Sequence, residues 1–180
     1  MADGYAAVGD CVGMTMPIMG SGISASIRAG AMLARAVLAD EEDCFTRETL
    51  WQYETEYMKK LGFAFSSLEL IKAVMTKLSK EDIAFLFDNK VFTSDDMTFG
   101  CDDISLLSLI GNMSIVDFID RAKKASANPA LLKKMSAVGV NFVKLKSITA
   151  TFPSKYSENS VERWAERYNG FFNSTLDRIS

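Results

Sequence analysis

A single strand-like segment in an otherwise helical sequence constrains the fold of this chain most. Residues 5–8, Tyr-Ala-Ala-Val, are apolar on both faces, as in a buried parallel strand. No other segment alternates convincingly between apolar and polar positions. Because a lone strand cannot form a sheet by itself, the sequence predicts a mainly α fold, a helical domain preceded by one orphan strand. We expect residues 1 to about 20 to be disordered, rearranged or paired with another copy.

Capping signals divide the rest of the chain into helices. The expected ranges are 22–39, 46–61, 63–77, 79–89, 104–110, 114–125, 128–139 with continuation to 148 as an option, and 159–179, with a loop at 91–103. Gly62 predicts a stop or a kink. Asn128 with Pro129 predicts one helix start, and Asn159 with Glu162 predicts another. In the first helix, one apolar stripe of the kind that faces a core is formed by Ile23, Ile27, Ala31, Ala34 and Leu38.

The composition excludes several kinds of chemistry. The chain has no histidine, and its three cysteines are far apart, so neither a zinc site nor a disulfide framework is indicated. We expect no metal site, and no catalytic residue is evident. Since the chain has neither a membrane-length apolar run nor a signal-like start, we expect a cytoplasmic protein with peripheral contact to a membrane as an option.

The charge is distributed unevenly. Residues 1–120 carry 9 basic and 19 acidic side chains, whereas residues 121–155 carry eight basic side chains and no acidic one. A basic stretch of this kind can attract a phosphate group, an anionic lipid surface or the acidic half of its own protein. The lysines expected to meet such a surface are Lys123, Lys124, Lys133 and Lys134. Nucleic acid is not expected as a partner, because the acidic majority would repel it.

The glycines near the start suggest a ligand site. Gly20-x-Gly22-x-x-Ala25 matches the dinucleotide fingerprint, but no strand stands directly before it or after the following helix, so it is not an opening Rossmann motif. The expected strand instead leads into Gly9-Asp10. There, a glycine allows close backbone approach, a carboxylate accepts hydrogen bonds from hydroxyl groups, and a helix N-terminus favours an electron-rich group.

These residues resemble a known family. Residues 8–13 (Val-Gly-Asp-Cys-Val-Gly) and 17–23 (Pro-Ile-Met-Gly-Ser-Gly-Ile) are similar to the second FAD motif of the para-hydroxybenzoate hydroxylase-type flavoproteins. They are most similar to the geranylgeranyl reductase and FixC-like branch, in which G-D-A-A-G precedes P-x-x-G-x-G-I and a long helix. The resemblance covers residues 5–40, and the remaining sequence is compatible with the helical carboxyl-terminal region of such enzymes.

The resemblance implies an FAD site. Asp10 would hold the ribityl hydroxyls, and the backbone amides of Gly20, Gly22 and Ile23 would face the pyrimidine edge of the flavin. Pro17 would shape the turn beside the ring. The resemblance also implies a boundary, with residues 1–40 as the remnant of an FAD-binding domain and residues 41–180 as a helical carboxyl-terminal domain.

The family's ADP-binding and NAD(P)H-contacting segments are not found in this sequence. We therefore expect a carboxyl-terminal part of an FAD-dependent oxidoreductase that is inactive alone and binds FAD weakly or not at all. Its expected partners are the missing amino-terminal FAD- and NAD(P)H-binding half and an apolar substrate, and self-association through the amino-terminal segment is a further expectation.

The parent enzyme would reduce C=C bonds of an isoprenoid-like or other apolar substrate by hydride transfer from the flavin. Candidates for lining a substrate tunnel are aromatic and methionine positions that core packing explains equally well. They are Phe63, Phe65, Phe85, Phe87, Trp51 and Met75. Two alternatives remain open at this point: a flavin monooxygenase of the same fold, and a non-catalytic helical module that binds lipid or protein.

Overall fold

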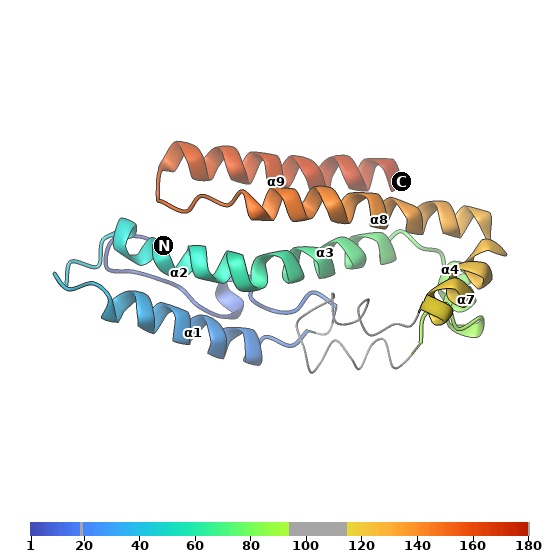
Figure 1. Ribbon diagram of the computed structural model, residues 1–180, viewed down its shortest axis with the longest axis horizontal. Coiled ribbons are helices and arrows are strands. Elements are labelled where there is room, and N and C mark those ends of the chain that lie inside the picture. Colours follow the sequence, from blue (N-terminus) through green and yellow to red (C-terminus); the bar gives the residue numbers. More distant parts are fainter. Residues whose placement is uncertain (19, 94–114, 180) are drawn as a thin grey trace.

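The helices of the chain run mostly side by side along one long axis (Figure 1). The computed structural model describes residues 1–18, 20–93 and 115–179. Its elements, in chain order, are the short 3₁₀ helix η1 (Asp10–Val12), α1 (Ile23–Leu38), α2 (Arg47–Tyr57), the π-helical turn η2 (Met58–Gly62), α3 (Phe63–Met75), α4 (Lys80–Asp88), α7 (Ile115–Ser126), α8 (Pro129–Ala150) and α9 (Glu158–Ile179). The mainly α fold is confirmed. The expected helix at 104–110 and most of the expected loop at 91–103 lie outside the described residues.

The strand pattern at residues 5–8 does not form a strand here, which corrects that part of the prediction and agrees with the expectation that the amino-terminal segment is rearranged. Tyr5 forms only an isolated antiparallel bridge with Ala2, and residues 6–8 have no regular secondary structure. A strand requires a neighbour for its backbone groups. Instead, this segment runs over the helices: the Gly4 amide donates to the Phe45 carbonyl, and an Asp3 carboxylate oxygen accepts from the Arg47 amide at the start of α2.

Helices α2 and α3 form the centre of the molecule. They are joined by the π-helical turn η2, which lies at the predicted kink at Gly62. A Cβ atom on Gly62 would lie 2.8 Å from the Met58 side chain, so the glycine leaves room for that methionine. Helix α1 packs against α2 on one side, and the α8–α9 hairpin packs against α3 on the other, while α4 and α7 lie together at one end (Figure 1).

Helix α1 buries the opposite face from the one that its apolar stripe predicts. Its buried residues are the small Ala25, Ala29 and Ala36, together with Met32. The three large aliphatic side chains of the predicted stripe are exposed: Ile23 by 76%, Ile27 by 69% and Leu38 by 84%. Alanines let two helix backbones approach closely, which explains why this face meets α2. The result is an apolar surface on α1 that no described residue covers.

Helix ends follow local signals in most places. Ser79 and Asp82 form a capping box at the start of α4, and the Asn128 side chain accepts from the Leu131 amide at the start of α8. The predicted cap of the last helix was wrong by two residues, because the helix begins at Glu158, directly after Ser157. Asn159 lies inside α9, and the Ser157 carbonyl accepts from the first-turn amides of Ser160 and Val161.

Three clusters of buried side chains hold the helices together. The largest joins Met14 and Met16 of the amino-terminal segment to α1, α2 and α3. It spans both sides of residue 40, and the domain boundary there stays a prediction. A second cluster joins Leu70 of α3, Leu145 of α8 and Phe171 of α9, and a third lies where α4, α7 and the start of α8 meet.

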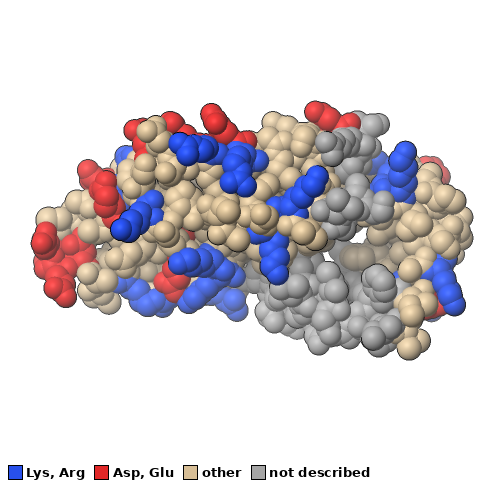
Figure 2. Space-filling view, turned by 45° about the horizontal axis from the view of Figure 1, so that its top comes forward, with Lys and Arg blue, Asp and Glu red and all other residues tan. Residues whose placement is uncertain are grey.

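Charged side chains cover much of the surface. Figure 2 shows several acidic side chains at one end of the molecule and others along its upper edge, with Lys and Arg side chains distributed over most of the same face. Among the described residues, no helix is both long enough and apolar enough to cross a membrane.

Candidate functional site

The Gly9-Asp10 turn lies against the start of α1. Gly9 has a φ of +94°, which favours glycine, and a Cβ atom there would lie 3.3 Å from the Ser26 hydroxyl of α1. The Gly9 carbonyl accepts hydrogen bonds from the amides of Val12 and Met14, and this closes the turn. The chain therefore bends sharply at Gly9 and places Asp10 at the amino-terminal end of α1.

Asp10 and Gly22 are in direct contact. A Cβ atom on Gly22 would lie 2.2 Å from Asp10 Oδ1, so any larger residue there would require this carboxylate to move. The Thr15 hydroxyl donates a hydrogen bond of 2.6 Å to the same Oδ1 atom. In the described part of the chain, no hydrogen bond reaches Asp10 Oδ2, and the side chain is exposed. One carboxylate oxygen is thus held in place, and the other faces solvent.

Pro17 and Gly20 lie in the loop that leads into α1, and Ile23 begins that helix. The Gly20 amide donates to the Met16 carbonyl, and the Met16 amide donates to the Ser21 carbonyl, which makes a compact turn around Pro17. Gly20 is exposed, and Ile23 is the first residue of α1, with its side chain in solvent. The structure thus brings Gly9, Asp10 and Gly22 together, and it places Pro17 and Gly20 in the adjoining loop and Ile23 at the start of α1.

The amino-terminal end of α1 has no side-chain cap. Gly22 is the N-cap and has no side chain to accept from the first-turn amides. Unsatisfied amides and the helix dipole favour negative charge at this end, which also accounts for the position of Asp10. The residues present therefore fit a cofactor that offers hydroxyl donors to Asp10 and an electron-rich edge to the amides, as FAD does.

Two residues that support this loop were missed by the sequence analysis. Thr15 holds Asp10, and its position between two glycine turns could have drawn attention to it. Tyr53 of α2 is buried beneath the loop, donates to the Ala7 carbonyl at 3.3 Å and lies beside Met14. Burial, reinforced by the nearby Glu54, raises the pKa of Tyr53, so its hydroxyl stays a donor. No local signal links Tyr53 to residues so far away in the sequence.

The proposed tunnel residues do not form one surface. Trp51 and Phe65 are buried in the core, whereas Phe87 is partly exposed near the far end of the molecule. Phe63, by contrast, lines a pocket of about 390 Å³ between the turn η2 and the end of α8, with Met58 and Phe152 among its other walls.

The basic stretch is partly matched inside the protein. Lys134 forms an ion pair with Asp82 of α4 at 2.7 Å, and Lys124 forms one with Asp120 at 2.6 Å. The other two lysines named for a lipid surface are exposed. For Lys124 and Lys134, these ion pairs favour a match with acidic residues of the same protein. Contact of the basic stretch with a lipid surface stays a prediction.

Comparison with known proteins extends the resemblance beyond the first forty residues. No family model matches the chain. The chain is similar to the digeranylgeranylglycerophospholipid reductase of Sulfolobus acidocaldarius, with 25% identity over 178 residues. The match covers 97% of this chain and 38% of that reductase, so the chain spans well under half the length of this relative. The similarity is distant, and it supports a relationship to geranylgeranyl reductase-like proteins.

Proposed function

We propose that this chain forms part of an FAD-dependent oxidoreductase that reduces C=C bonds of an isoprenoid-like or other apolar substrate. The observation that carries the proposal is the contact between the Asp10 carboxylate and Gly22 at the open end of α1. The proposal is also supported by the similarity of the chain, over 97% of its length, to a reductase named for a digeranylgeranyl lipid.

The chain would supply one side of the flavin site. Asp10 Oδ2 would accept hydrogen bonds from ribityl hydroxyls. Of the three amides expected to face the electron-rich edge of the ring, those of Gly22 and Ile23 would do so, whereas the Gly20 amide donates to the Met16 carbonyl. Bound FAD would supply the hydride for the reduction. Thr15 and Tyr53 would act as positioning residues, because they hold Asp10 and the backbone that leads to it.

The remaining contacts to FAD would come from further polypeptide. The exposed aliphatic surface of α1, formed by Ile23, Ile27 and Leu38, supports this part of the proposal. Three large aliphatic side chains on one exposed helix face are typical of an interface. We propose that this surface packs against the FAD- and NAD(P)H-binding half and that the chain alone binds FAD weakly or not at all.

The apolar substrate is the finer part of the proposal. The pocket beside Phe63 offers aromatic and methionine walls, and Lys59 and Lys146 also line it. Such a pocket suits part of a hydrocarbon chain that ends in an anionic group.

A chimera tests the proposed function. The segment of the Sulfolobus acidocaldarius reductase that this chain matches would be replaced by the 180-residue chain. We expect the chimera to retain FAD, measured by flavin absorbance after gel filtration, and to reduce a prenylated lipid without consuming oxygen. Asp10→Ala should weaken FAD binding about tenfold, as expected for the loss of hydrogen bonds to a charged acceptor.

Asp88→Ala is the matched control, because Asp88 is an exposed carboxylate at the end of α4, far from α1 in the fold (Figure 1). It should leave FAD affinity unchanged. Equal FAD affinity in the Asp10→Ala and unchanged chimeras would refute the role of Asp10. Tight, stoichiometric FAD on the isolated chain would refute the need for a second half, and oxygen-dependent product would indicate a monooxygenase instead.

A further inference from the structure

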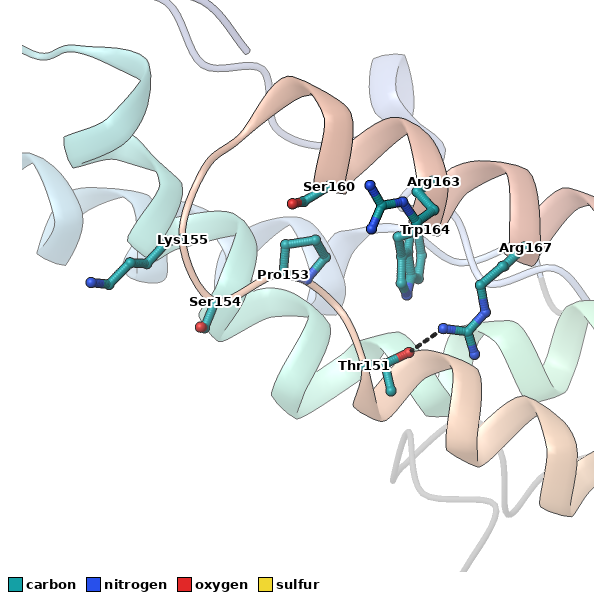
Figure 3. Close-up of a pocket in the computed structure, with 8 residues that line it drawn as sticks. All are labelled: Thr151, Pro153, Ser154, Lys155, Ser160, Arg163, Trp164 and Arg167. Carbon is teal, nitrogen blue, oxygen red and sulfur yellow. Dashed lines mark hydrogen bonds between the residues drawn. The ribbon is translucent and has the colours of Figure 1, made fainter.

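A second, positively charged pocket lies far from the Gly9-Asp10 turn in sequence. It has a volume of about 410 Å³ and is formed by the α8–α9 connection and the first three turns of α9 (Figure 3). Three basic and three hydroxyl side chains line it, and no acidic side chain of the described residues does. They are Lys155, Arg163, Arg167, Thr151, Ser154 and Ser160.

Two arginines dominate this pocket. Arg163 and Arg167 are four residues apart, so they lie one helical turn apart on the same side of α9. Figure 3 shows both guanidinium groups reaching from α9 toward the α8–α9 connection, on either side of Trp164, while Lys155 extends outward at the rim. Arg167 donates a hydrogen bond of 3.5 Å to the Thr151 hydroxyl.

The positive charge of this pocket is not balanced within the described part of the chain. Neither Arg163 nor Arg167 forms an ion pair there, although Glu162 and Glu166 are their neighbours in sequence. Glu162 is one residue from Arg163, and Glu166 is one residue from Arg167, which turns each glutamate about 100° around the helix from that arginine. Glu166 is also three residues from Arg163, but the two side chains form no ion pair in the described part of the chain. Like charges four residues apart destabilise a helix. An anion between the two guanidinium groups would remove this repulsion.

The floor of the pocket is rigid. Trp164 stacks on Tyr168 with ring centroids 5.0 Å apart, meets Phe152 edge-on at 5.0 Å, and donates from Nε1 to the Ile148 carbonyl at 2.9 Å. The connection itself is tied to α2, because Trp51 Nε1 donates to the Pro153 carbonyl at 2.8 Å. A pocket that is held open in this way needs little reorganisation to bind a ligand.

We propose that this pocket binds the phosphate group of a phosphate ester. Guanidinium groups bind phosphate oxygens in pairs of parallel hydrogen bonds, and the Ser160 hydroxyl adds a donor at the edge. The volume is within the range of small-molecule sites, so it admits the organic part of the ester beside the face of Trp164. The ester is either a soluble molecule or the head group of a lipid, and the proposal does not depend on flavin binding.

Binding of two probes to the full chain tests this proposal. Calorimetry with sn-glycerol 1-phosphate reports a soluble ester, and flotation with phosphatidylglycerol vesicles, compared with phosphatidylcholine vesicles, reports a lipid head group. We expect binding to at least one probe, weakened by added salt. Arg163→Gln and Arg167→Gln should each weaken it about tenfold, since each removes charge-assisted hydrogen bonds.

Arg28→Gln is the matched control, because Arg28 is an exposed arginine on α1. It should change the affinity less than twofold, and circular dichroism melting should show that all three variants are folded. Binding of glycerol phosphate supports a soluble ester, and binding of anionic vesicles alone supports a lipid. The proposal is wrong if neither probe binds, or if both pocket variants bind as tightly as the Arg28 variant.

Discussion

Replacing Gly22 with alanine tests the contact on which the candidate site depends. The new Cβ atom would lie 2.2 Å from Asp10 Oδ1, whereas ordinary contact begins near 3.4 Å. The Asp10 carboxylate must therefore move by more than 1 Å and lose its hydrogen bond from Thr15. The backbone angles of Gly22, a φ of −110° and a ψ of −12°, are acceptable for alanine, so the clash is the main source of strain.

The expected loss of stability is moderate. The hydrogen bond contributes about 0.5–1.5 kcal/mol, and alanine at an N-cap costs about 1 kcal/mol relative to glycine. Gly22→Ala should therefore lower the free energy of unfolding by about 1.5–2.5 kcal/mol. For a chain of this length, each kcal/mol lowers Tm by about 2–4 °C. In an Asp10→Ala background there is no Oδ1 atom to displace, and only the capping cost of about 1 kcal/mol should remain.

Urea denaturation of the wild-type chain, both single variants and the double variant measures this coupling. We expect a coupling free energy of about 1 kcal/mol between Asp10 and Gly22. If Gly22→Ala costs the same with and without the Asp10 carboxylate, the two residues are not in contact, and the candidate site is wrong as described.

Two further predictions concern stability. Leu145 is fully buried between α3 and α9, so Leu145→Ala should lower the free energy of unfolding by about 2–5 kcal/mol in urea denaturation. The control is Lys144→Ala at the exposed neighbouring residue, which should change the free energy of unfolding by less than about 0.5 kcal/mol. Equal effects of the two substitutions would contradict the described packing. Hydrogen bonds from the Thr49 hydroxyl and the Phe45 amide lower the pKa of Asp40 below its ordinary 3.8. The Asp40 carboxylate therefore stabilises the fold above about pH 4, and this contribution is lost as the pH falls through the pKa of the folded state. Denaturation at neutral pH and near pH 3 should show a smaller stability difference in Asp40→Asn than in the wild type, and an unchanged difference would exclude Asp40 as a source of acid sensitivity.

Helix starts were well predicted because they depend on short-range interactions. The capping box of Ser79 and Asp82, and the Asn128 cap before Pro129, involve residues three positions apart or fewer. The error at the last helix was also local. Ser157 and Asn159 are both suitable caps, and only the path of the preceding turn selected Ser157.

The orientation of α1 could not be predicted from its own residues. Periodicity shows that Ile23, Ile27 and Leu38 share a stripe, but it does not show which surface the stripe meets. Close approach to α2 required the alanine face, and this left the aliphatic face outside. The failed strand at residues 5–8 has the same cause, because strand formation depends on a partner that local sequence does not reveal.

The sequence by itself determined the helical class, most of the helix ends and the association of glycines with Asp10, since these depend on residues close together in the chain. Only the tertiary structure decided that Asp10 meets Gly22 and Thr15, that Tyr53 supports their loop, and that Arg163 and Arg167 share a pocket with the α8–α9 connection. Those contacts join separate elements, and side-chain size and packing across the whole molecule select them.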